Sequence, residues 1–65
     1  MTVSIIFKNG RKDIINKAEY INYTDTELII ETDIIIYSYN LNIVNYIIVG
    51  EQKNSTEKYF EKIEN

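Results

Sequence analysis

The sequence has no cysteine, histidine, proline or tryptophan and only two glycines among its 65 residues. Without cysteine the chain has no disulfide and no thiolate nucleophile or zinc ligand. Without histidine it has no imidazole base, and so no catalytic triad built on one. A domain this short also rarely encloses a reaction pocket. We therefore predict a protein that is not an enzyme and that uses no metal and no cofactor.

Targeting signals are also missing. The first residues lack the basic segment and long apolar segment of a signal peptide. No apolar run approaches the ~20 residues that a membrane-spanning helix needs. The absence of cysteine fits a reducing compartment. We therefore expect a protein of the bacterial cytoplasm that does not contact a membrane.

The small size limits what can stabilise the fold. A domain of this length buries little apolar surface, and disulfides, metals or oligomerisation commonly supplement it. Because the first two are excluded here, we expect a homo-oligomer. We divide the chain into a small β-barrel over residues 1–50 and a tail over residues 51–65 that packs on the barrel or on a partner subunit.

The first fifty residues alternate between apolar and polar side chains in the manner of strands. Asn9-Gly10 predicts a type I′ hairpin turn after the first strand. A long second strand follows, with a bulge near Ala18–Ile21; a helical turn over residues 13–20 is the alternative. The predicted strands cover residues 2–8, 11–23, 27–32, 34–39 and 45–49, with a short 3₁₀ turn over residues 40–42.

The tail has a different periodicity. Thr56, Tyr59, Phe60 and Ile63 recur at helical spacing, and residues 54–55 are suitable N-caps. These features predict a short C-terminal α-helix. A helix this short is marginal alone, so its apolar side chains must dock on the barrel or on a second subunit.

Five short antiparallel strands predict a mainly β fold, either a small barrel or a strongly curled sheet. The brief turn before the last strand resembles that of SH3-like and Sm-like barrels. The opening Ile5-Ile6-Phe7-Lys8-Asn9-Gly10 resembles the start of small phage and prophage accessory proteins of low-GC Gram-positive bacteria. This resemblance covers residues 3–49. It implies an accessory protein of a mobile element, and no catalytic residue is carried over.

The charges are unevenly placed. The net charge is −3, and no lysine or arginine occurs between Ala18 and Gln52. This segment carries a row of carboxylates on one predicted turn, strand and turn: Asp25, Glu27, Glu31 and Asp33. Such a row either meets a basic protein surface or is the solvated face of an amphipathic strand. Two glutamates four residues apart on a strand are separated by about 13–14 Å, which is too wide for one metal ion.

The fourth and fifth predicted strands carry no charge, and both of their faces are apolar. A 65-residue barrel buries only one such face, so the surplus predicts a shared surface. We expect Tyr37 and Tyr39 to join the carboxylate row in binding a protein partner. The predicted oligomer interface consists of Ile35, Tyr46, Ile47, Tyr59 and Phe60.

Three functions fit these patterns. The first is a non-enzymatic protein-binding accessory protein of a phage or mobile element, acting as a stoichiometric inhibitor of a host or defence nucleic-acid enzyme. The alternative is an oligomeric barrel that binds RNA or single-stranded DNA through Lys8, Arg11 and Lys12, with Tyr20 or Tyr23 stacking on a base. The acidic net charge argues against it. The third is a phage structural or assembly component.

Overall fold

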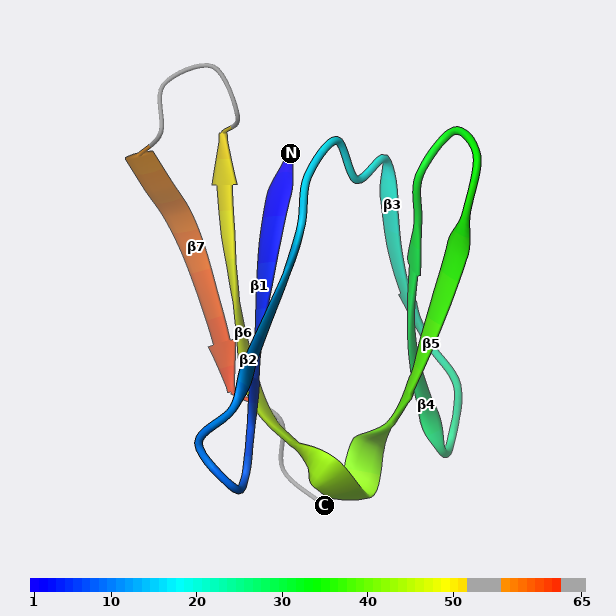
Figure 1. The fold of residues 1–65 in the computed structure, drawn as a ribbon, viewed down its shortest axis with the longest axis vertical. Helices are drawn as coiled ribbons and strands as arrows, with labels where there is room; N and C mark the ends of the chain where they lie inside the picture. Colours follow the sequence, from blue (N-terminus) through cyan, green and yellow to red (C-terminus); the bar gives the residue numbers. More distant parts are fainter. Residues whose placement is uncertain (52–55, 63–65) are drawn as a thin grey trace.

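The computed structural model describes residues 1–51 and 56–62 and shows a mainly β protein (Figure 1). Its strands are β1 (Thr2–Phe7), β2 (Lys12–Ile15), β3 (Tyr20–Tyr23), β4 (Glu27–Glu31), β5 (Ile36–Asn40), β6 (Val44–Glu51) and β7 (Thr56–Lys62), and a 3₁₀ turn, η1 (Leu41–Ile43), joins β5 to β6. The mainly β class and the 3₁₀ turn are confirmed. Within these ranges no helix has the length and apolarity needed to cross a membrane.

The strands form two antiparallel sheets. The first sheet has the order β2-β1-β6-β7, and the second has the order β3-β4-β5. The two sheets stand opposite each other and η1 connects them at one end (Figure 1). Among the described residues no hydrogen-bonded strand pairing joins one sheet to the other, so the fold is not a closed barrel.

The predicted long second strand is divided between the two sheets. Lys17 takes a left-handed conformation with φ of 59°, and the strand turns there. Ala18 still bonds to the chain end that leads into β1, because its N–H donates to the Met1 carbonyl and its own carbonyl accepts from the Met1 ammonium group. The next residue, Glu19, donates its N–H to the carbonyl of Glu31 in the second sheet. A sharp crossing therefore replaces the predicted bulge, and no helical turn forms.

The first hairpin also differs from the prediction. A type I′ turn needs positive φ at two residues, but only Gly10, with φ of 90°, has it. The Gly10 N–H donates to the Phe7 carbonyl, and the Phe7 N–H donates to the Arg11 carbonyl. The side chain of Asn9 accepts a hydrogen bond from the Arg11 N–H at 2.9 Å. This pattern is that of a three-residue loop closed by a left-handed glycine.

The core lies between the two sheets. It consists of inward-facing side chains from four strands and the crossing segment: Val3, Ile5, Ile15, Ala18, Leu28, Ile30, Val44 and Ile47. The alternation in β4 predicted that Leu28 and Ile30 face inward, and both are fully buried; the alternating Val3 and Ile5 of β1 are fully buried as well. Register is fixed by this pattern, because a slip of one residue would expose each buried side chain.

The predicted C-terminal helix is wrong for Thr56–Lys62, which forms strand β7 along the free edge of β6. The edge of β6, whose residues 44–50 carry no charge, would otherwise present unpaired backbone groups to solvent. The tail residues threonine, tyrosine and phenylalanine also favour strands. Pairing with the sheet therefore overrides the local helical spacing. The proposed capping residues Asn54 and Ser55 lie outside the described residues.

Candidate functional site

The outward side of the second sheet carries the predicted carboxylates. Because Leu28 and Ile30 point inward, Glu27, Ile29 and Glu31 point outward from β4. The cross-strand register places side chains of β3 and β5 beside them on the same side. We call this surface the acidic sheet face; its members are Tyr20, Asn22, Glu27, Ile29, Glu31, Ile36 and Ser38.

Hydrogen bonds from neighbouring strands orient the two glutamates. The Ser38 hydroxyl donates to Glu27 Oε2 at 2.6 Å, and the Asn22 amide Nδ2 donates to Glu31 Oε2 at 3.2 Å. Each bond leaves the other carboxylate oxygen available to a partner. The two carboxylates thus project from a rigid sheet at fixed positions rather than from loops.

The turn between β4 and β5 carries three consecutive isoleucines. The Thr32 hydroxyl oxygen accepts from the N–H groups of Ile34 and Ile35, and the Thr32 N–H donates to the Ile35 carbonyl. This bonding fixes a turn from which the side chains extend into solvent. The exposed fractions are 81% for Ile34, 44% for Ile35 and 68% for Ile36. These three exposed apolar side chains, which we call the isoleucine patch, begin at the edge of the acidic sheet face, to which Ile36 also belongs.

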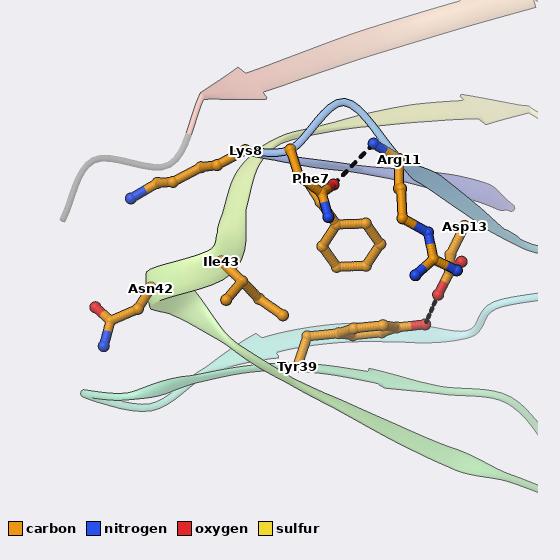
Figure 2. A pocket seen from close by; sticks show the side chains of 8 residues that line it. Phe7, Lys8, Arg11, Asp13, Tyr39, Asn42 and Ile43 are labelled. Atoms are coloured by element: carbon orange, nitrogen blue, oxygen red, sulfur yellow. Dashed lines mark hydrogen bonds between the residues drawn. The ribbon is translucent and has the colours of Figure 1, made fainter.

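A pocket of about 450 Å³ opens between the first hairpin and η1 (Figure 2). We call it the hairpin pocket; it is lined by Phe7, Lys8, Asn9, Arg11, Asp13, Tyr39, Asn42 and Ile43. The rings of Phe7 and Tyr39 contact each other, with centroids 5.7 Å apart and planes tilted by 49°. The Tyr39 hydroxyl donates to Asp13 Oδ2 at 3.4 Å, which links the two sheets across the pocket.

Tyr39 is the titratable group most altered by this environment. The pKa of Tyr39 is raised to about 12, first by partial burial and then by the neighbouring Asp13 carboxylate, through its charge and through the hydrogen bond it accepts. Tyr37 contributes in the same direction. Tyr39 is therefore a neutral hydrogen-bond donor at physiological pH.

The residues predicted to bind a protein do not share one surface. Glu27 and Glu31 lie on the acidic sheet face, whereas Asp25 and Asp33 are exposed in the turns at opposite ends of β4. The two predicted tyrosines, Tyr37 and Tyr39, are half-buried on the inward side of β5 and pack against the core. The carboxylate row is thus formed in part, and the tyrosines belong to the opposite side of the sheet.

The predicted oligomer interface is dispersed. Ile47 is fully buried inside the chain, so it has no surface for a second subunit and its assignment was wrong. Tyr46 is half-buried on β6 in the first sheet, whereas Ile35 is exposed beside the second. The backbones of Tyr59 and Phe60 lie in β7, and their side chains are outside the described part of the structure.

The predicted basic cluster is partly assembled. Lys8 and Arg11 line the hairpin pocket, whereas Lys12 pairs with Ile6 on the outward side of the first sheet. The tyrosines proposed for stacking, Tyr20 and Tyr23, lie on β3 in the second sheet.

The rings that line the hairpin pocket were missed from the sequence. Phe7 ends a strand whose earlier inward residues are buried, and from the sequence it was used only as part of the strand alternation. Its position next to a charged turn was the available signal that it borders solvent. Tyr39 could not have been paired with it, because the contact joins residues of different sheets.

Comparison with protein families, with curated proteins and with solved structures gives no match to this chain. The site must therefore be interpreted from its own chemistry. Among the described residues no group of three or more histidine, cysteine or acidic side chains is placed to hold a metal ion.

Proposed function

We propose that the protein is a non-enzymatic binding protein that docks the acidic sheet face and the adjoining isoleucine patch on a basic protein surface. The exposure of Ile34 and Ile36 beside the fixed carboxylates of Glu27 and Glu31 carries this proposal. An exposed apolar patch bordered by polar groups is typical of interaction sites. The apolar centre supplies binding energy and the carboxylates select a cationic partner.

A basic partner fits this surface better than a second copy does. A two-fold contact through the acidic sheet face would bring the carboxylates of both copies together, and such like-charge contacts are costly. A cationic surface such as one that normally holds nucleic acid would neutralise them instead. The segment from Ala18 to Gln52 has no lysine or arginine that would repel such a surface.

The biological setting that we propose rests on the sequence resemblance. The opening strand and turn are similar to those of phage and prophage accessory proteins, so the protein would act as an accessory protein of a mobile element. The strand arrangement supports an SH3-like or Sm-like relationship, because two small antiparallel sheets stand opposite each other and a 3₁₀ turn precedes β6. Stoichiometric inhibition of a host or defence nucleic-acid enzyme is the form of activity that the acidic sheet face favours.

The test compares capture of host proteins by the immobilised wild-type chain and by variants. Glu27→Lys with Glu31→Lys should abolish retention of the partner, and Ile34→Ser with Ile36→Ser should abolish it separately. Asn16→Lys, a change toward positive charge at an exposed residue of the crossing segment, is the control and should retain the partner. Rising salt should weaken capture, because the contact is partly ionic.

Two results would refute the proposal. The first is recovery of the same proteins by all of these variants. The second is sedimentation of the wild-type chain as a dimer that the isoleucine variants convert to monomer, because the patch would then be occupied by a second copy.

A further inference from the structure

The hairpin pocket is a second site, independent of the acidic sheet face, and the backbone holds its shape. The Lys8 N–H donates to the Ile43 carbonyl at 2.9 Å, which fastens the hairpin loop to η1. The Leu41 N–H donates to the Thr26 carbonyl, which fastens η1 to the second sheet. The pocket is thus anchored in both sheets. Its volume of about 450 Å³ lies within the range of sites for small molecules.

The interior of the pocket suits a flat ring. Phe7 and Tyr39 present tilted aromatic surfaces, and Ile43, which is 52% exposed, offers an aliphatic surface beside them (Figure 2). Bases and other planar rings stack on such side chains. The guanidinium of Arg11 extends over the same space toward Asp13 (Figure 2), and arginine also stacks on planar rings.

The two ends of the pocket differ in charge. At one end Asp13 accepts the hydrogen bond from Tyr39 and provides a carboxylate that can accept further donors, such as a ring amino group. At the other end Lys8 and Asn42 extend outward, and Asp13 is the one carboxylate among the residues that line the pocket (Figure 2). An anionic group is therefore favoured at the Lys8 end and a ring with donor groups at the Asp13 end.

We propose that the hairpin pocket binds a nucleoside monophosphate, with its base against Phe7 and Tyr39 and its phosphate beside Lys8. A single phosphate suits this site better than a long strand does. Polynucleotides draw their affinity from many cationic contacts, and this chain has a net charge of −3 and no cation between Ala18 and Gln52. The remaining negative charge would repel the following phosphates of a strand.

The test is a titration of the ¹⁵N-labelled full chain with adenosine 5′-monophosphate, followed by amide chemical shifts. Shifts should be confined to the hairpin loop, β2 near Asp13, Tyr39 and η1. Separate titrations use adenosine and inorganic phosphate. Each should bind at least about tenfold more weakly than the nucleotide, since each lacks one half of the contacts.

Three variants separate the contributions. Lys8→Ala should weaken nucleotide binding about tenfold and leave adenosine binding unchanged, because it removes a charge-assisted contact to phosphate. The matched control is Lys12→Ala, an exposed lysine on the outward side of the first sheet, which should bind like the wild type. Tyr39→Ala should weaken binding of both nucleotide and adenosine. Its fold is verified by circular dichroism.

Three outcomes would overturn the proposal. One is the absence of shifts at millimolar nucleotide. Another is equal loss of affinity in the Lys8→Ala and Lys12→Ala variants, which would indicate a diffuse charge effect. The third is binding of a single-stranded oligonucleotide by a chain that does not bind the mononucleotide, which would assign the pocket to a strand. The acidic sheet face lies on the outward side of the second sheet, whereas Tyr39 lines the pocket from the inward side of β5. Partner binding at that face can therefore fail or succeed without affecting these results.

Discussion

The left-handed residue at the crossing between the sheets gives the sharpest test of the fold. Lys17 is exposed and has a φ of 59°. A side chain in this conformation costs about 1–2 kcal/mol because its Cβ crowds the following carbonyl oxygen. Glycine removes that strain but loses roughly 0.5–1 kcal/mol through the greater freedom of the unfolded chain. Lys17→Gly should therefore raise the free energy of unfolding by about 0.5–1 kcal/mol.

A β-branched residue should have the opposite effect at the same position. Valine tolerates a left-handed conformation poorly, so Lys17→Val should lower the free energy of unfolding by about 1–3 kcal/mol. In a domain of this size each kcal/mol shifts Tm by roughly 4–8 °C. Urea titration and thermal unfolding, both followed by circular dichroism, measure these differences.

Lys12 provides the matched control, since it is an exposed lysine within the regular strand β2. There the order should reverse: Lys12→Gly should destabilise by roughly 0.5–1 kcal/mol, and Lys12→Val should be neutral or stabilising. If the Lys17 variants rank as the Lys12 variants do, Lys17 is extended. The chain would then continue as one strand, and the division into two sheets would be refuted.

Two further predictions concern the hairpin pocket. Gly10→Ala should lower the free energy of unfolding by about 1–2 kcal/mol. The cause would be the backbone φ of 90° alone, because an added Cβ meets no atom within 4 Å. Gly10→Asn should lower Tm less than Gly10→Ala does, because asparagine tolerates this conformation, and an equal decrease of Tm in the two variants would contradict the prediction. Since the pKa of Tyr39 is raised from 10.0 to about 12, its neutral form is favoured in the fold, and the stability it contributes is complete below pH 10 and lost as the pH rises toward 12. Urea unfolding measures the free energy of unfolding from pH 9 to pH 12, and it should fall less for Tyr39→Phe than for the wild type. If it falls equally in both proteins, neutral Tyr39 beside Asp13 does not contribute this pH-dependent stability.

Local alternation was sufficient to predict where most strands of the first fifty residues lie and which side chains of β4 point inward. In β4 the sequence Glu27-Leu28-Ile29-Ile30-Glu31 alternates with period two, and the structure buries the leucine and the second isoleucine as expected. Asn40 could likewise be identified as a break, because its side chain accepts from the Asn42 N–H at the start of η1. Such features depend only on neighbours in sequence, which is why they were predictable.

Features that depend on distant pairing were not predictable. The residues 16–17 at the crossing carry no glycine or proline that would mark a sharp turn. Its position is set by bonds from Ala18 to Met1 and from Glu19 to Glu31, which no local pattern encodes. The conformation of Thr56–Lys62 could not be predicted for the same reason. Its apolar residues have helical spacing, but pairing with the free edge of β6 determines its conformation.

The two candidate sites are separate surfaces that share one strand. In β5 Tyr39 points inward and reaches the hairpin pocket, whereas Ile36 and Ser38 point outward to the acidic sheet face. A slip of β5 by one residue would exchange these sides and remove both sites together. By contrast, Lys8 and Glu27 each belong to one site alone. Substitutions at these two positions can therefore separate the functions, whereas substitutions that shift β5 cannot, and only the former can show that the protein has two independent binding sites.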